Sequence, residues 1–239
     1  MTKNIVIKFG GSLLFSDGGT INSQKITEFC NIIKSNKNYN SIVIVCGGGT
    51  VARHYIQAIR ASTENEVLCD LIGIDMSRIN SRLILAEMKE LAYPQVPKSF
   101  EELSVAMSSH KIVVMGGLQP GQSTTSVAIT VAEYLKADKL VILTDVDGIY
   151  DKDPNLHKDA KLLEKISYGS LQKLILESSV NTQASAGEYR IFDAVSLQIL
   201  KRSGLSVLVM SGKKLNQFSK FWNNEKEIIG TIISKKDFK

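Results

Sequence analysis

Two cationic side chains stand beside glycine-rich turns in this sequence, an arrangement suited to holding phosphate groups. The first, Lys8, lies in the apolar stretch 4–9, which runs directly into Gly10, Gly11 and Ser12. Glycines let backbone N–H groups turn toward an anion, and a lysine in an otherwise apolar strand needs a partner for its ammonium group. We therefore expect Lys8 to face a bound phosphate. The alternative is an edge position from which the lysine stem reaches water.

The second cation, Arg53, follows the triple glycine of residues 47–49, which closes the apolar run 41–46. Its predicted place about one turn into a helix lets the guanidinium reach the same anion that the glycine N–H groups face. The neighbouring His54 is expected to point elsewhere, because adjacent helical residues do not share a face. The alternative for Arg53 is a solvated surface side chain.

A third turn of this kind lies in the stretch 112–126, which reads IVVMGGLQPGQSTTS. Its apolar run predicts a buried strand, and the hydroxyls of residues 123–126 would add donors at the start of a helix. The alternative is an ordinary strand-loop-helix junction in which these hydroxyls only cap the helix. Because all three turns follow predicted parallel strands, we expect them to converge on one crevice.

Polar residues with room for a ligand recur on a predicted helix over residues 64–90. Asp70, Gly73 and Ser77 are spaced three and four apart, which places an acid, a glycine and a hydroxyl on one helix face. This face suits a polar ligand. A solvated helix face, with Asp70 acting only as a cap, is the alternative.

Two carboxylates, those of Asp145 and Asp147, follow the apolar run 139–144 and precede Gly148. Acidic side chains at the end of a strand, next to a glycine that permits a turn, suit a corner that binds a nucleotide and magnesium. Asp and Gly are also common in plain turns, so the motif alone leaves both interpretations open.

Composition and charge set limits on the class of protein. The 239 residues carry 29 basic and 24 acidic side chains, a net charge of +5, and the lysines are scattered rather than blocked. This pattern does not indicate a nucleic-acid binder. Apolar runs are too short for a membrane span, and we expect a cytoplasmic protein. Three cysteines without CxxC spacing predict buried reduced thiols, and three distant histidines make a His-based zinc site improbable.

The elements that must position these residues alternate between strands and helices. Apolar runs predict strands over residues 4–9, 41–46, 112–115, 139–144, 205–210 and 228–233. Helices are expected around the stripe 26–33, over 64–90, after Ser99, from about 126 to 136, near 169–177, and over 193–202. This alternation predicts one open, mainly parallel α/β sheet with ligands outside the carboxyl ends of its strands. No GxxxxGK[ST] or GxGxxG motif is present, so separate glycine turns must hold any phosphates.

Six motifs resemble those of the amino acid kinase superfamily, most closely its archaeal-type uridylate (UMP) kinases. They are KFGGS at 8–12, CGGGTVARHYI at 46–56, DLIGIDMSRIN at 70–80, MGGLQPGQSTT at 115–125, LTDVDGIYDKDP at 143–154 and SAGEYRIFDAVSLQIL at 185–200. The resemblance implies a single domain over 1–239, a three-layer α/β sandwich with a mainly parallel central sheet of eight strands. It also implies a homohexamer that phosphorylates UMP with ATP and magnesium, with an acceptor-nucleotide half over about 1–135 and an ATP half over about 136–239.

Particular residues take roles under this resemblance. Lys8 and Arg53 would be catalytic, and the direct magnesium ligands stay unassigned. The ATP side would comprise Gly11, Ser12, Gly49, Arg53, Thr144, Asp145, Tyr150 and Asp153. The UMP side would comprise Gly48, Asp70, Gly73, Ser77, Leu118, Gln119, Pro120, Gly121, Gln122, Ser123 and Thr124. Two positions depart from the pattern: Asp145 stands where many relatives have Asn, and Ser123 where Thr is frequent.

The function implied is ATP-dependent conversion of UMP to UDP by direct in-line transfer, a step of pyrimidine nucleotide biosynthesis. Other kinases of the superfamily, acting on acetylglutamate, carbamate or isopentenyl phosphate, are the alternatives. The prenyl substrate is disfavoured because those kinases carry a histidine where this sequence has Arg53. A non-catalytic protein resembling the molybdenum storage proteins is an alternative of a different class.

Overall fold

Seven strands form one sheet in the computed structural model, which describes residues 3–16, 18–152, 154, 156–179, 191–225 and 227–236. The strands are β1 (Asn4–Phe9), β2 (Ser41–Cys46), β3 (Ile112–Met115), β4 (Lys139–Thr144), β5 (Lys165–Ser167), β6 (Val207–Ser211) and β7 (Thr231–Ser234). Their order is β3-β2-β1-β4-β6-β7-β5, and only the pairing of β6 with β7 is antiparallel. The prediction of a mainly parallel sheet is confirmed.

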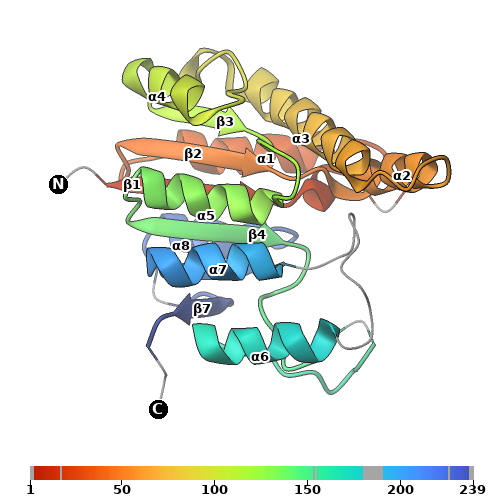
Figure 1. The fold of residues 1–239 in the computed structure, drawn as a ribbon. Helices are drawn as coiled ribbons and strands as arrows, with labels where there is room; N and C mark the ends of the chain where they lie inside the picture. Colours follow the sequence, from red (N-terminus) through yellow and green to blue (C-terminus); the bar gives the residue numbers. More distant parts are fainter. Residues whose placement is uncertain are drawn as a thin grey trace.

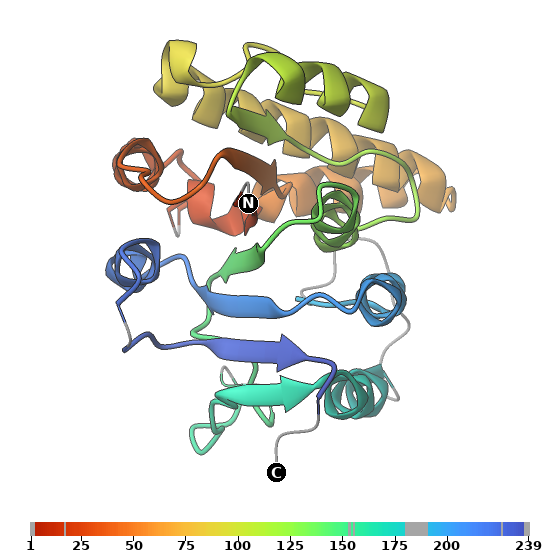
Figure 2. The same cartoon turned by 90° about the vertical axis from the view of Figure 1, so that its left-hand side faces the viewer.

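Helices cover both faces of this sheet (Figures 1 and 2). They are α1 (Ser23–Lys34), α2 (Gly49–Arg60), α3 (Glu66–Met88), α4 (Phe100–Ser109), α5 (Thr124–Tyr134), α6 (Tyr168–Ser179), α7 (Ala194–Ser203) and α8 (Leu215–Trp222), with short 3-10 turns at Gly11–Leu14 and Lys89–Leu91. Buried residues of α1, α8 and the end of α3 pack on one face, and those of α4 to α7 pack on the other. The predicted three-layer α/β sandwich is therefore present.

The strand sequences explain why both faces are covered. Ile5 and Ile7 enter the core under α1, whereas Val6, between them, enters the core under α5, and all three are fully buried. A strand that buries both sets of side chains has no need of polar alternation, which is the pattern of parallel sheets. On the first face, Phe29 lies between Phe9 and Phe218, with ring centroids 4.3 and 5.7 Å away.

The order of the strands creates a switch point beside β1. The chain builds β2 and β3 on one side of β1 and then continues with β4 on the other side. In open α/β sheets, a crevice forms at such a point, outside the carboxyl ends of the strands. The crevice therefore lies where Lys8, near the end of β1, and the turns after β2, β3 and β4 come together.

Several local expectations are confirmed and others are corrected. Four strands begin and end at the predicted residues, while β6 and β7 begin two and three residues later than expected. Helix α3 runs without a break from Glu66 to Met88, so the glycine at position 73 does not interrupt it. The sheet has seven strands within the described residues, one fewer than the resemblance implied.

The cysteines agree with the expectation of buried reduced thiols. Cys30, Cys46 and Cys69 are all free and buried. Burial raises the pKa of the Cys46 thiol to about 12, so this group stays protonated at neutral pH. Among the described residues, none of the helices is both long enough and apolar enough to cross a bilayer.

Candidate active site

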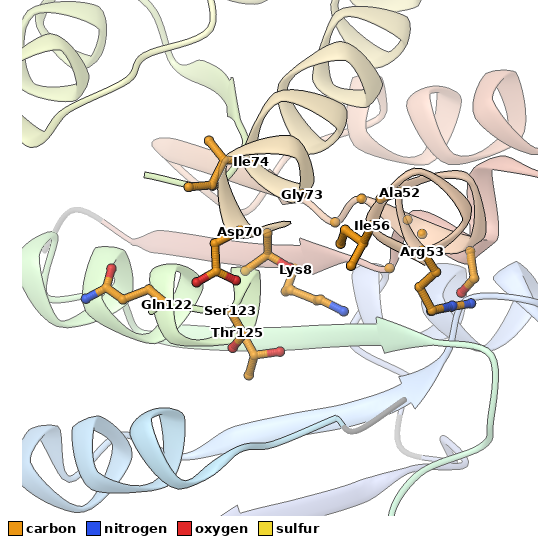
Figure 3. Close-up of a pocket in the computed structure, with 18 of the residues that line it drawn as sticks. Lys8, Ala52, Arg53, Ile56, Asp70, Gly73, Ile74, Gln122, Ser123 and Thr125 are labelled. Carbon is orange, nitrogen blue, oxygen red and sulfur yellow. The ribbon is translucent and has the colours of Figure 1, made fainter. Parts of the chain in front are cut away.

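A cavity of about 230 Å³ opens at the carboxyl ends of the first four strands (Figure 3). It gathers residues from every glycine-rich turn that the sequence singled out. The predicted site residues that line it are Lys8, Gly11, Ser12, Gly48, Gly49, Arg53, Asp70, Gly73, Gln122, Ser123, Thr124 and Thr144. The three turns therefore converge on one cavity, as the strand pattern predicted.

Lys8 stands in the wall of this cavity. Its neighbours on the sheet are Val45 of β2 and Ile142 of β4, so its ammonium group has apolar strands on both sides. Burial lowers the pKa of Lys8 from its ordinary value of 10.5 to about 8, and the nearby Asp145 carboxylate opposes part of this shift. A partly buried ammonium that lines a cavity is a group prepared to receive an anion.

Arg53 lies one turn into α2 and points into the same cavity (Figure 3). Its guanidinium donates a hydrogen bond to the Thr50 hydroxyl at 3.0 Å, and no ion pair holds it among the described residues. One bond uses a small part of the five donors of a guanidinium. The remaining donors are available to a ligand, which is the arrangement expected of a phosphate-binding arginine.

Two of the glycine turns are in direct backbone contact at the floor of the cavity. A methyl group on Gly11 would lie 2.3 Å from the backbone nitrogen of Gly49, and one on Gly49 would lie 2.4 Å from the carbonyl carbon of Gly11. Gly49 also has a φ of +74°, which favours glycine. The sheet ladder continues into both turns, since Gly10 N–H donates to the Leu143 carbonyl and Gly47 N–H to the Phe9 carbonyl. Only glycines permit this close approach.

The hydroxyl cluster of the third turn divides between capping and lining. Ser123 caps α5 by accepting a hydrogen bond from the Ser126 N–H at 3.2 Å, and Thr125 donates to the Ile191 carbonyl at 2.9 Å. Thr124 lines the cavity, and its hydroxyl has no hydrogen-bond partner among the described residues. Ser123 therefore takes the capping role and also lines the cavity, and a role of the cluster in binding an anion stays a prediction.

Asp70 faces the cavity from the second turn of α3 and is also tied to the third glycine-rich loop. Its carboxylate accepts a hydrogen bond from the Gly121 N–H at 2.8 Å. The neighbouring Gln122 lines the cavity (Figure 3), whereas Leu118, Gln119, Pro120 and Gly121 do not. Asp70 thus holds this loop beside the cavity with one carboxylate oxygen and leaves the other for a ligand.

Ser77 differs from its predicted role as a ligand-binding hydroxyl. It is fully buried and does not line the cavity. Its hydroxyl donates to the Ile74 carbonyl at 2.6 Å and accepts from the Gly117 N–H at 2.7 Å. Spacing along α3 placed it on the correct face, but the close packing of Gly116 and Gly117 against the helix puts it behind the loop. Its hydroxyl supports the loop from behind.

The strand β4 contributes the other side of the site. Thr144 lines the cavity, and its hydroxyl donates to the Asp145 carboxylate at 3.2 Å. Asp147 instead forms an ion pair with Lys214 at 2.8 Å. Asp145 and Tyr150 lie outside the lining, and Asp153 falls outside the described residues. Within the described ranges, no group of three or more acidic, histidine or cysteine side chains could hold a metal ion.

Sequence reasoning missed several lining residues. Ala52, Ile56 and Ile74 give the cavity an apolar wall, and Ile191 enters it from far along the chain. The helix periodicity around Arg53 could have indicated Ala52 and Ile56, since they share the buried side of α2. Nothing in the local sequence signals Ile191, because its position depends on the bond that its carbonyl accepts from Thr125.

Comparisons with known proteins agree with this fold. A family profile described as the amino acid kinase family matches residues 3–211. A uridylate kinase of Methanobrevibacter smithii is 40% identical over 232 residues, 97% of this chain and 99% of the relative, and one of Sulfurisphaera tokodaii is 40% identical over 230 residues, covering 96% and 98%. A crystal structure of uridylate kinase from Archaeoglobus fulgidus superposes with a TM-score of 0.79 at 32% identity, covering 96% of this chain and 99% of that one. A UMP kinase structure from Ureaplasma parvum has a TM-score of 0.79 at 23% identity, covering 98% and 100%, a likeness of fold alone.

Proposed function

We propose, from the premise that this chain belongs to the amino acid kinase family, that it transfers the γ-phosphoryl group of ATP to UMP and so supplies UDP to pyrimidine nucleotide biosynthesis. The observation that carries the proposal is the gathering of Lys8, Arg53 and three glycine turns around one cavity beside Asp70. Two cations and many backbone N–H groups suit two phosphates that must approach each other. Relatives named uridylate kinase support UMP as the acceptor.

The acceptor nucleotide is assigned to the side of the cavity formed by α3 and the loop 117–124. Asp70 would accept hydrogen bonds from the ribose hydroxyls with the oxygen that Gly121 leaves open, and Gln122 and Thr124 would contact the nucleotide. Gly48 and Gly73 leave space for it. At about 230 Å³ the enclosed volume is smaller than a typical drug-sized pocket of about 300–1,000 Å³. The cavity therefore suits the reacting phosphates, with the bases extending outside it.

The donor nucleotide is assigned to the side formed by the first two glycine turns and β4. Gly11, Ser12 and Gly49 would contact the ATP phosphates, and Thr144, Asp145, Tyr150 and Asp153 would surround the adenosine. Asp145 lies outside the cavity lining, and the described residues hold no group of three or more acidic, histidine or cysteine side chains, so a magnesium ion that arrives with ATP would be held mainly by phosphate oxygens and water. Such an ion would add charge neutralisation at the phosphates.

The proposed reaction is an in-line displacement without a covalent intermediate. An oxygen of the UMP phosphate attacks the γ-phosphorus of ATP, the bond from that phosphorus to the ADP oxygen breaks, and ADP leaves. Lys8 and Arg53 offset the repulsion between the two anions and hold the charge on the transferring group. No general base is required, because the attacking phosphate is already ionised at neutral pH. The apolar side chains of Ile56 and Ile74 would reduce the number of water molecules beside the transferring group.

A panel of acceptors tests this function directly. Purified protein with ATP and magnesium is expected to form ADP rapidly in the presence of UMP and not with N-acetylglutamate, carbamate or isopentenyl phosphate. Coupled detection of ADP measures each rate. Turnover with one of the other acceptors would assign the chain to a different kinase of the family. Absence of turnover with all four, together with uptake of molybdate, would favour a storage protein.

Asp70→Ala is expected to raise the KM for UMP by roughly ten- to a hundred-fold, because each charge-assisted hydrogen bond to the ribose contributes about 1.5–3 kcal/mol. The KM for ATP should barely move. Steady-state kinetics with UMP and deoxy-UMP measure both effects, since deoxy-UMP lacks one ribose hydroxyl. The wild type should discriminate against deoxy-UMP, and the variant should lose most of that preference.

Asp70→Ala also removes the hydrogen bond from the Gly121 N–H, so it could change the position of the loop 117–124 as well as the contact with the ribose. Asp70→Asn separates the two roles, because its amide oxygen can still accept the Gly121 N–H while the charge offered to the ribose hydroxyls is lost. If Asp70→Ala keeps its affinity for UMP and only unfolds at a lower temperature, Asp70 is a structural anchor of the loop, and the assignment of this side to UMP is wrong.

We also propose a cytoplasmic homohexamer that binds neither nucleic acid nor membranes. Large apolar side chains on α2 and α3 support self-association, because Tyr55, Val67, Leu68, Leu71 and Ile79 are each 43–55% exposed in the single chain. Light scattering is expected to give a mass about six times 26.3 kDa. Ile79→Glu should lower this mass, since it places a charge on that surface, whereas Lys158→Glu on the exposed 156–160 turn should not. An unchanged mass for Ile79→Glu would show that the surface of α3 around Ile79 is not part of the subunit interface.

A further inference from the structure

A buried asparagine behind the second glycine turn plays no part in the site as described so far. Asn80 lies on α3, is 1% exposed, and does not line the cavity. Its side-chain nitrogen donates to the Gly47 carbonyl at 2.7 Å and to the Gly48 carbonyl at 3.0 Å. Both hydrogens of one amide group are therefore used on two successive peptide groups of the turn.

These two bonds determine where the N–H groups of the turn point. In a planar trans peptide the N–H is directed opposite to the C=O. The carbonyls of Gly47 and Gly48 point toward α3, so the N–H groups of Gly48 and Gly49 point away from it. Both glycines line the cavity, and the turn packs against Gly11, where a methyl group would lie 2.3 Å from the Gly49 nitrogen and 2.4 Å from the Gly47 carbonyl oxygen. Asn80 thus turns two donors toward the space where phosphates would bind.

The remaining atom of the amide argues against a purely stabilising role. The side-chain oxygen of Asn80 is buried and has no hydrogen-bond partner among the described residues. A buried acceptor without a partner lowers stability, so an asparagine that serves only to stabilise α3 is a poor choice at this position. Its two donors match the two carbonyls of the turn, which a serine, aspartate or leucine would not do.

We propose that Asn80 is a positioning residue for phosphoryl transfer, which acts by orienting the N–H groups of Gly48 and Gly49 toward the reacting phosphates. The inference rests on the proposed function of the cavity. It differs from the roles of Lys8 and Arg53, because Asn80 never touches the substrates. Misplacement of groups at a reacting centre by about 1 Å can lower the rate about a hundred-fold, so the effect of losing these bonds is expected mainly in kcat.

Asn80→Asp tests the proposal with almost no change in volume. At pH 7.5 a carboxylate would face two carbonyl oxygens and could not donate to either, so kcat is expected to fall roughly ten- to a hundred-fold. Burial raises the pKa of such a carboxyl group. As the pH falls and the group is protonated, its O–H can donate to one carbonyl, so the ratio of variant to wild-type kcat should rise. Thermal unfolding at the same pH values separates the two roles, because a merely structural residue would lower Tm and leave the kcat of the folded protein unchanged.

Ser81→Ala is the matched control. Ser81 is also fully buried on α3; its hydroxyl donates to the Ser77 carbonyl at 2.8 Å and lies beside the Cys46 thiol at the end of β2, but it bonds to neither Gly47 nor Gly48. We expect this variant to keep kcat within about twofold of the wild type, even where thermal unfolding shows a lower Tm. If Asn80→Asp loses no more kcat than Ser81→Ala, or if its loss is the same at every pH, the positioning role is wrong.

Two further measurements cover the cases in which Asn80→Asp does not fold or the wild type does not act on UMP. If Asn80→Asp does not fold, Asn80→Ser is measured instead. Its hydroxyl is too short to span both carbonyls, so kcat should fall about tenfold, and a value within about twofold of the wild type would overturn the proposal. If the wild type itself does not act on UMP, the proposed function fails separately. The role of Asn80 is then tested by kcat with whichever acceptor is turned over, and a protein that turns over none of them overturns the role together with the function.

Discussion

Arg53→Ala is expected to lower kcat by about 10²- to 10³-fold, with a much smaller change in the KM for ATP and for UMP. The guanidinium points into the cavity and is held by a single bond to Thr50, so most of its donors face the place where phosphates would meet. Charge on the transferring phosphoryl group is distributed differently in the transition state than in bound ATP. A cation beside that group therefore stabilises the transition state more than the bound substrates, and its loss lowers mainly kcat. Steady-state kinetics with both substrates varied give the measurement.

The neighbouring residue provides a matched control for Arg53. His54 is exposed on α2, next in sequence but on another side of the helix. His54→Ala should leave kcat within about twofold of the wild type. A normal kcat for Arg53→Ala with only a raised KM would mean that Arg53 binds substrate and transition state equally, and its catalytic role would be excluded.

The central strands could be predicted from sequence because each is a continuous apolar run with a glycine-rich or polar boundary. Residues 41–46 and 112–115 bury every apolar side chain, which gives a clear signal for parallel strands. Strand β5 escaped prediction because it has three residues, too few for any periodicity. Helix α8 also escaped, since its buried residues Leu215, Phe218 and Trp222 span only two turns.

Convergence of the site could be predicted for a related reason. Parallel strands end at the same edge of a sheet, so turns that follow β1, β2 and β3 must meet there. What the sequence could not provide is the partner of each polar group. Ser77 lies on the predicted face of α3, yet its hydroxyl accepts a hydrogen bond from the N–H of Gly117, forty residues away. Asp147 similarly meets Lys214, a contact between the turn after β4 and the start of α8.

Lys8→Met is expected to lower kcat/KM by about 10²- to 10³-fold, because methionine keeps most of the volume of the stem and removes a partly buried cation at the phosphates. The pKa of Lys8 adds a second readout. Since that pKa is lowered to about 8, the free protein loses the Lys8 charge as the pH rises through 8, and kcat/KM of the wild type should fall there. A pH profile of kcat/KM between 6 and 10 measures this, and Lys8→Met should lack the descending limb.

Asp145→Asn tests whether Asp145 keeps Lys8 charged. The carboxylate raises the pKa of Lys8 against the effect of burial, so its loss should move the descending limb to lower pH.

The stability of the protein gives an independent check of sign: the unfolded chain binds the Lys8 proton up to its ordinary pKa of 10.5, whereas the folded protein releases it near 8. The contribution of Lys8 to the free energy of unfolding should therefore rise with pH between these values and be absent in Lys8→Met. If the alkaline fall in kcat/KM of Asp145→Asn occurs at the same pH as in the wild type, Asp145 does not act on Lys8. If Lys8→Met still shows that fall in kcat/KM, the fall belongs to another titrating group.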